Sequence, residues 1–227
     1  MYLSKLLLNK GSREVRLDLN DCQQLHRTVM SAFPMLEKKG LGARSECGVL
    51  YRLEAIENGK IALLVQSKLL PEWNKLPDKY VLSTPNSSLC KEIDFIYEQL
   101  EDGMVLNFRL RANPTHKQRG KRIPIKGEIG VVNWLKQKGE VHGFELVKIS
   151  LNSGSETIEY PNLESTREHV LTGSKSNGTE KIQILFNSVL FDGELIITKK
   201  DMFVHTLMHG VGSGKGYGFG LLSINLA

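Results

Sequence analysis

The amino-acid sequence predicts an α+β protein made of two consecutive halves with the same order of elements. In each half, stretches with strand-like alternation and stretches with helix-like spacing follow one another as β-α-β-β-α-β, although the second helix of the first half is only weakly marked. An acidic turn, Glu101-Asp102-Gly103, separates the halves, and 227 residues suffice for two domains of about 100 residues. We therefore expect two tandem ferredoxin-like (RRM-like) domains, covering residues 1–100 and 101–227.

The first half contains one long amphipathic helix between short strands. The helix is expected over residues 16–34, with Asp18 or Asn20 as its cap. Apolar residues at helical spacing form its buried stripe, namely Cys22, Leu25, Val29, Ala32 and Phe33. Asn58-Gly59 is a strong turn signal and predicts a hairpin. Strands are expected at residues 2–9, 48–56 and 60–68.

The end of the first half is less clearly marked. Residues 71–79 are interpreted as a short helix or loop, and residues 83–88 as turn-rich. The alternation of Ile93, Phe95 and Tyr97 favours a closing strand, and a helix is the alternative.

The second half repeats this order. Strands are expected at residues 105–112, 144–151, 182–190, 195–197 and 221–224, and helices at residues 129–138 and 199–209. Asp192-Gly193 is interpreted as a turn, Thr198 as the cap of the last helix, and residues 152–164 as a polar loop. In the first of these strands, Arg109 and Arg111 point to one face.

Composition excludes a few classes of protein. No run reaches the length of apolar residues that a membrane helix needs, so no membrane association is expected, and the first residues lack the features of a signal peptide. Three widely spaced cysteines, Cys22, Cys47 and Cys90, favour a reducing cytoplasm. The net charge is only +5, so the distribution of charge is more informative than its sum.

The tail contains six glycines, one at every second position from Gly210 to Gly220, with Lys215 among them. Such a backbone can present N–H groups in a concavity beside a cation, which suits phosphate, and Gly212, Gly214 and Gly216 are the candidates. The spacing matches neither a dinucleotide fingerprint nor a P-loop. A flexible turn or a series of β-bulges is the structural alternative.

Basic residues gather between residues 104 and 127, where there is no acidic residue. This segment contains Arg109, Arg111, Lys117, Arg119, Lys121, Arg122 and Lys126. Such a patch is typical of binding to a phosphate backbone, and a solvated loop is the alternative. A second candidate is the hairpin signal at residues 175–178, where Lys175 and Lys181 lie on a ribbon that can enter a nucleic-acid groove. An ordinary exposed hairpin is the alternative, and on this signal alone it is the more frequent case.

His26 lies beside the core stripe of the first helix, one turn after Gln23. A histidine in this position is more often structural than catalytic. RNA, however, carries its own nucleophile, the 2′-OH, so its cleavage needs a proton acceptor or donor and nearby cations but no metal. His26 can supply the proton transfer, and Arg27 and Lys215 can stabilise charge. Asp201, His205 and His209 recur at metal-ligand spacing, but a solvated helix face explains them better.

Four separated stretches together resemble one known family over essentially the whole chain. They are Met1-Tyr2-Leu3-Ser4-Lys5, Leu25-His26-Arg27-Thr28, Phe108-Arg109-Leu110-Arg111-Ala112-Asn113-Pro114, and the glycine tail continued through Leu221-Leu222-Ser223. The sequence resembles the CasE family, the CRISPR RNA-processing endoribonuclease of the type I-E Cascade complex.

The resemblance implies tandem ferredoxin-like domains that bind the repeat stem-loop of precursor CRISPR RNA. It implies cleavage at the 3′ base of the stem without metal or cofactor, and retention with other Cascade subunits. His26 falls on the family's catalytic histidine. Some relatives have a tyrosine three residues earlier, where this sequence has Gln23. Proton transfer is therefore expected to depend on His26. Lys175 and Lys181 lie where the family's basic hairpin would be.

Two other interpretations remain open on the sequence. The protein can be a non-catalytic RNA-binding subunit of the same kind of complex, with Gln23 marking lost activity. It can also be a small-ligand or nucleotide-binding module built on the glycine tail, although the spacing of the glycines counts against this.

Overall fold

The computed structural model describes residues 1–34, 43–82, 90–153, 156–177 and 180–226. Its first sheet has four antiparallel strands in the order β2-β3-β1-β4. These strands are β1 (Tyr2–Leu8), β2 (Leu50–Ala55), β3 (Ile61–Ser67) and β4 (Cys90–Glu92). The β2–β3 turn predicted at Asn58-Gly59 is confirmed, and both residues have positive φ (60° and 67°), as tight hairpins require. The turn predicted at residues 83–88 lies outside the described residues.

The long helix predicted for the first half is two helices, α1 (Arg13–Asn20) and α2 (Cys22–Ser31). The chain leaves helical geometry at Asp21 (φ −138°), whose Oδ1 accepts hydrogen bonds from the backbone N–H groups of Gln23 (2.8 Å) and Gln24 (3.2 Å). Asp21 is therefore the cap, and the prediction of Asp18 or Asn20 was wrong. The buried stripe is confirmed, because Cys22, Leu25, Val29, Ala32 and Phe33 are all buried.

The closing strand predicted from Ile93, Phe95 and Tyr97 was wrong, and the helical alternative is correct. β4 ends at Glu92, and α4 (Asp94–Glu98) follows. Ile93 and Tyr97 are buried one helical turn apart, whereas Phe95 is 57% exposed. Upstream, residues 71–79 contain only a short 3-10 turn, η2 (Trp73–Lys75). Two other short turns of the first half are η1 (Glu57–Gly59) and α3 (Ala43–Glu46).

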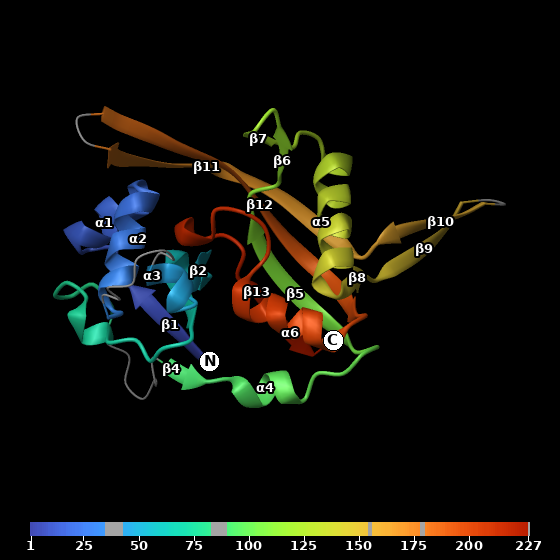
Figure 1. Ribbon diagram of the computed structural model, residues 1–227, viewed down its shortest axis with the longest axis horizontal. Helices are drawn as coiled ribbons and strands as arrows, with labels where there is room; N and C mark the ends of the chain where they lie inside the picture. The colour runs from blue at the N-terminus through green and yellow to red at the C-terminus, as the bar shows by residue number, and fades with distance from the viewer. Residues whose placement is uncertain (35–42, 83–89, 154–155, 178–179, 227) are drawn as a thin grey trace.

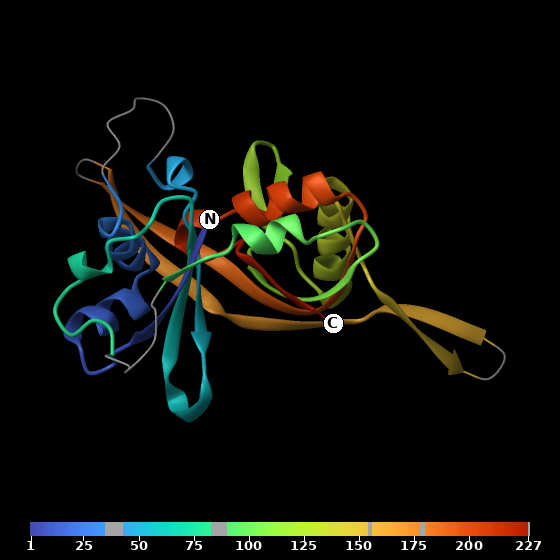
Figure 2. The same cartoon turned by 90° about the horizontal axis from the view of Figure 1, so that it is seen from below.

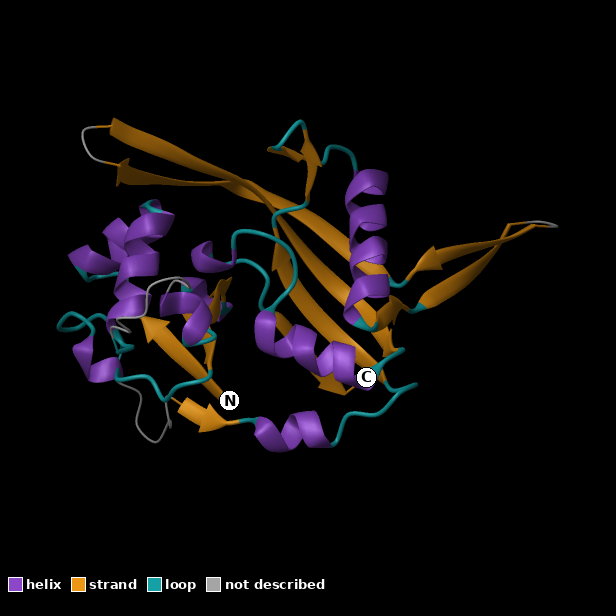
Figure 3. Cartoon of the chain, in the orientation of Figure 1, coloured by secondary structure: helices purple, strands orange, loops and turns teal. Residues whose placement is uncertain are grey.

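The second sheet has the order β11-β12-β5-β13, with β8 paired to the end of β12. Its strands are β5 (Val105–Ala112), β8 (Phe144–Leu146), β11 (Leu163–Asn177), β12 (Glu180–Ile197) and β13 (Leu222–Leu226). Helices α5 (Glu128–His142) and α6 (Lys200–His209) cover one face of it (Figures 1 and 3). The predicted α+β class with two ferredoxin-like units is confirmed.

Four expectations for the second half were wrong, and two of them concern Asp192-Gly193 and Thr198. Asp192-Gly193 is not a turn, because β12 runs through it. Gly193 instead permits close approach of the neighbouring chain, since an added Cβ would lie 2.4 Å from the carbonyl oxygen of Asn162. Thr198 does not cap α6, whose first N–H, from Lys200, donates to Asp102 Oδ1 at 2.6 Å.

The polar segment predicted as a loop at residues 152–164 is largely β-structure. It forms most of a hairpin of β9 (Lys148–Ser153) and β10 (Glu156–Pro161) and the start of β11. This hairpin extends away from the sheets (Figure 2). Together with β8, β9 also replaces the single strand predicted at residues 144–151.

Two hydrophobic cores hold the molecule together. The first lies between α1, α2 and the first sheet, and the second between α5, α6 and the second sheet. Ile93, Tyr97 and Leu100 belong to the second core, so α4 packs with the second half although it precedes residue 101. The division at residues 100 and 101 stays a prediction. No helix in the described part of the chain is long and apolar enough to cross a membrane.

A buried arginine joins the two sheets. Arg52 on β2 is 2% exposed, and its Nη1 donates to the carbonyl oxygens of Arg109 on β5 (3.1 Å) and Leu221 (2.9 Å). Its Nη2 donates to Ser223 Oγ (2.9 Å), and Glu54 accepts from Nε and Nη2. Burial lowers the pKa of Arg52 and the charge of Glu54 opposes that effect. We call this set of contacts the Arg52 clamp.

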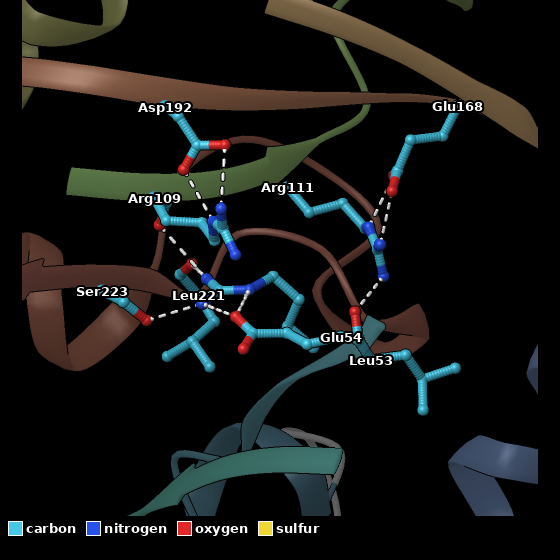
Figure 4. Close-up of polar contacts among 9 residues, drawn as sticks. Leu53, Glu54, Arg109, Arg111, Glu168, Asp192, Leu221 and Ser223 are labelled. Carbon is cyan, nitrogen blue, oxygen red and sulfur yellow. Dashed lines mark hydrogen bonds and ion pairs between the residues drawn. The ribbon is translucent and has the colours of Figure 1, made fainter. Parts of the chain in front are cut away.

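Arg111 makes a second connection in the opposite direction (Figure 4). Its Nη1 donates to the carbonyl oxygen of Leu53 on β2 (2.7 Å), and it pairs with both carboxylate oxygens of Glu168 on β11 (2.6 and 2.5 Å). Burial opposes ionisation of Glu168, but the hydrogen bonds and charge of Arg111 outweigh it, so the pKa of Glu168 is lowered. The two halves are therefore fixed to each other by charged hydrogen bonds to backbone carbonyls.

His142 ends α5 and is half-buried against α6, where its Nδ1 lies 2.8 Å from Thr206 Oγ1. Burial, together with the positive charges of Lys138, Lys215 and His205, lowers the pKa of His142 to about 4.

Because the unfolded chain binds a proton at His142 near its ordinary pKa of about 6.5, acid favours the unfolded state. We expect wild-type stability to fall more steeply than that of His142→Asn as pH decreases from about 6.5 to about 4. Denaturant midpoints measured at several pH values test this. Parallel curves for the two proteins would contradict it.

Candidate active site

A cavity of about 610 Å³ opens between α2 and the second half of the chain. It is lined by His26 on α2 and by residues Gly212 to Tyr217 of the glycine-rich segment, which extends from Gly210 to Gly220. Other lining residues come from the end of β5, from the hairpin of β6 (Thr115–Gln118) and β7 (Lys121–Pro124), and from β12. They are Asn113, Thr115, Arg122, Pro124, Leu185, Phe186 and Asn187. Among the described residues that line the cavity, His26 is the sole contribution of the first half.

His26 is half-buried on the face of α2 that turns towards the glycine-rich segment. Its Nδ1 is buried. The centroid of the imidazole lies 5.8 Å from that of the Tyr217 ring. A neutral imidazole can accept a proton at one nitrogen and donate one at the other, which is the property that general acid–base catalysis requires.

The glycine-rich segment needs its glycines for conformation. Gly212 (φ 79°) and Gly214 (φ 78°) are among the five of its six glycines with positive φ, and Gly214 precedes the short 3-10 turn η3 (Lys215–Tyr217). A Cβ on Gly212 would lie 3.1 Å from the Trp134 ring, and one on Gly214 would lie 2.9 Å from the Phe219 ring. The segment is folded into this shape by packing, and Figure 1 shows it, in red, reaching from α6 and β13 towards α2.

The first half of the chain also holds this segment. Tyr51 on β2 donates its hydroxyl hydrogen to the carbonyl oxygen of Gly216 (2.7 Å), and Tyr217 donates to Gln23 Oε1 on α2 (3.0 Å). Lys215 and His26 therefore line one cavity, as the sequence predicted, although they are 189 positions apart in the chain.

Other predicted site residues lie elsewhere. Arg27 is exposed and is outside the described residues that line the cavity, because consecutive helical residues point about 100° apart. Arg109 pairs with Asp192 opposite it on β12 (2.6 Å), and Arg111 pairs with Glu168. Both guanidinium groups are therefore paired with carboxylates in this structure, and their role in binding RNA stays a prediction.

The rest of the predicted basic loop is a hairpin of β6 (Thr115–Gln118) and β7 (Lys121–Pro124). Its turn contains Arg119 and Gly120, both with positive φ. Four of its basic side chains are exposed, namely Lys117, Arg119, Lys121 and Arg122. None of them forms an ion pair with another residue that the structure describes. Since Arg122 also lines the cavity, this basic hairpin reaches the cavity that His26 lines.

The predicted ribbon around Lys175 and Lys181 is present as the far end of β11 and β12, which pair through Asn177 and Glu180. Lys175 is exposed, while the tip at residues 178 and 179 lies outside the described residues. The ribbon extends past α1 and α2 (Figure 1), and Ser174 donates to Asp21 Oδ2 at the start of α2.

Sequence reasoning missed several cavity residues. Tyr217 was visible within the glycine run, but its contact with α2 was not. Asn113, interpreted as a strand end, is buried and donates weakly to Ser213 Oγ (3.5 Å). Phe186 lies within the strand predicted at residues 182–190, but its position on the cavity wall was not predicted.

The histidines of α6 lie apart from the cavity-lining residues. The rings of His205 and His209 stack at 4.0 Å, and His209 Nε2 lies 3.4 Å from Lys68 Nζ. Burial and the neighbouring positive charges of His205, Lys68 and Lys215 lower the pKa of His209, although its backbone hydrogen bond opposes them. No group of three potential metal ligands occurs among the residues that the structure describes.

Comparison with known proteins agrees with this geometry. A family model described as "CRISPR associated protein" matches residues 1–225. The chain is 32% identical to the CRISPR-associated endoribonuclease Cse3 of Thermus thermophilus, over 99% of each chain. The chain belongs to the CasE/Cse3 family of CRISPR-associated endoribonucleases.

Two further similarities extend across the same family. The Cascade subunit CasE of Escherichia coli is 28% identical to the chain, over 99% of this chain and 98% of that protein. A structure of Cse3 bound to a 19-nucleotide RNA superimposes with a TM-score of 0.77 at 32% identity, covering 99% of this chain and all of that one.

The backbone conformation of the glycine-rich segment can be tested by substitution. Gly214→Ala should destabilise the protein by about 1–2 kcal/mol, because an L-residue is strained at this φ and its Cβ meets Phe219. Gly216→Ala is the matched control, since Gly216 is not among the positive-φ glycines, and it should change stability by less than about 0.5 kcal/mol. Chemical denaturation measures both. Equal effects of the two substitutions would mean that the segment does not have this conformation.

Proposed function

We propose that this protein is a metal-independent endoribonuclease that binds the repeat stem-loop of precursor CRISPR RNA and cuts at the 3′ base of the stem. The observation that carries the proposal is that His26, Lys215, Arg122 and the glycines Gly212, Gly214 and Gly216 line one cavity. It combines a proton-transfer group with cations and backbone amides at a site open to solvent.

The reaction needs no added nucleophile. The 2′-OH of the nucleotide before the cut attacks its own 3′ phosphorus, loses its proton, and the bond to the 5′ oxygen of the next nucleotide breaks. That oxygen receives a proton, so the products are a 2′,3′-cyclic phosphate and a 5′-hydroxyl. His26 transfers one of these protons through its imidazole, and Lys215 and Arg122 stabilise the negative charge on the phosphorane.

Two basic surfaces extend from the cavity and are suited to the RNA backbone. The β6–β7 hairpin presents Lys117, Arg119, Lys121 and Arg122, and the β11–β12 ribbon presents Lys175, with Lys181 assigned to it from the sequence. Arg109 and Arg111 are left out of this track, because carboxylates already satisfy them.

The relatives suggest partners. A relative is named as a Cascade subunit, and another was solved with bound RNA. We propose that this protein likewise stays with its product RNA and associates with other Cascade subunits. The wide spacing of Cys22, Cys47 and Cys90 in the sequence favours a reducing cytoplasm, and we propose that the reaction takes place there.

Cleavage of a labelled repeat hairpin in the presence of EDTA tests the function. The wild type should cut, and His26→Ala should bind the RNA but cut about 10²- to 10⁴-fold more slowly. Gln24→Ala, an exposed neighbour on α2, is the matched control and should cut like the wild type.

The outcomes separate the alternatives. Equal cutting by the wild type and His26→Ala would remove His26 from the mechanism. Binding without cutting by either protein would favour a non-catalytic RNA-binding subunit. Cutting that disappears in EDTA would contradict a metal-independent reaction.

A further inference from the structure

Tyr217 is the aromatic residue of the glycine-rich segment, and it contacts α2 in two ways. Its hydroxyl donates a hydrogen bond to Gln23 Oε1 (3.0 Å), and its ring lies 5.8 Å from the His26 imidazole, tilted by 51°. We propose that Tyr217, held by Gln23, is a positioning residue that keeps the His26 imidazole directed into the cavity. The proposal rests on the function proposed above.

The two partners of Tyr217 lie on one face of α2. Gln23 and His26 are three positions apart, so their side chains are neighbours one helical turn from each other. Gln23 is only 8% exposed, and a buried amide oxygen requires a donor. The phenol supplies that donor and thereby brings its own ring beside the imidazole. A serine or leucine at position 217 would do neither.

The Tyr217 ring is also fixed on its other side. It lies 5.1 Å from the ring of Phe186 on β12, which in turn lies 5.2 Å from Phe219. His26, Tyr217 and Phe186 therefore form a row of rings along the cavity, and packed rings of this kind have few alternative rotamers. Burial raises the pKa of Tyr217, so its hydroxyl keeps the proton that it donates to Gln23.

The same residue connects the imidazole to the cation of the site. Lys215 and Tyr217 belong to one 3-10 turn, in which the Tyr217 N–H donates to the carbonyl oxygen of Gly214 (2.8 Å). Fixing Tyr217 on α2 therefore sets the position of Lys215 relative to His26. Displacing catalytic groups by about 1 Å can slow a reaction by up to about 10²-fold, so such a constraint affects rate more than binding.

Single-turnover cleavage of the repeat hairpin, with RNA affinity measured separately, tests the proposal. Tyr217→Phe removes the donor and keeps the ring, and Gln23→Leu removes the acceptor. Each should slow cleavage by about 3- to 10-fold, the amount expected for one hydrogen bond, while the Kd for RNA stays within about twofold of the wild-type value. The double variant should be no slower than the slower single variant, because both changes remove the same interaction.

A second comparison asks whether Tyr217 acts through His26. In a His26→Ala background, Tyr217→Phe should leave the residual cleavage rate unchanged. A further 3- to 10-fold loss there would overturn the proposal, because Tyr217 would then act independently. Wild-type cleavage by both Tyr217→Phe and Gln23→Leu would overturn it as well.

Two further outcomes distinguish a structural role of Tyr217 from a failure of the proposed function. A Kd for RNA that rises in step with the loss of rate in both variants would indicate a structural role and overturn the proposal. If His26→Ala alone cleaves like the wild type, the proposed function fails, and this result is distinct from every outcome for Tyr217.

Discussion

The arrangement of this protein depends on one buried guanidinium group. Arg52 leaves the first sheet and ends among acceptors of the second, the carbonyl oxygens of Arg109 and Leu221 and the hydroxyl of Ser223. Burying a charge is costly unless it is paired and fully hydrogen-bonded, and Glu54 supplies the paired charge. Because these acceptors have fixed positions, the Arg52 clamp holds the two halves in one relative orientation. Arg111 adds a contact from the second half to the backbone of β2.

The candidate active site requires that orientation. His26 comes from the first half, and the glycine-rich segment, the basic hairpin and Phe186 come from the second. Leu221, an acceptor of the clamp, immediately follows the last glycine of the segment, and Tyr51, the neighbour of Arg52, donates to Gly216. The clamp and the loop anchor therefore lie on adjacent residues of β2. A change in the angle between the halves would move His26 relative to Lys215.

Local signals in the sequence predicted much of the fold and part of the site. The Asn58-Gly59 turn, the stripe from Cys22 to Phe33 and the strand carrying Arg109 depend on neighbouring residues and were found correctly. His26 and Lys215 could be proposed as site residues because RNA cleavage requires a proton-transfer group and a nearby cation.

The failures arise where distant residues decide the outcome. Gly193 is a glycine because Asn162 approaches it, and a pattern within the strand cannot distinguish this from a turn. Arg109 and Arg111 look unpaired in the sequence until the fold brings Asp192 and Glu168, from strands far along the chain, within reach of them. Tyr217 could not be linked to Gln23, because 194 positions separate them and only the fold brings them together. Arg27 lies next to His26 on α2 but outside the described residues that line the cavity, and its role in charge stabilisation stays a prediction.

The central claim is that the Arg52 clamp positions His26 for cleavage while the basic hairpins bind RNA. The most direct test compares Arg52→Met/Glu54→Gln, which removes the clamp without leaving an unpaired carboxylate, with Glu54→Gln alone, which keeps the contacts between the halves. The account predicts that the double variant binds the repeat hairpin nearly as well as the control but cleaves it about 10- to 100-fold more slowly in single-turnover reactions. Equal cleavage rates for the two proteins would contradict it.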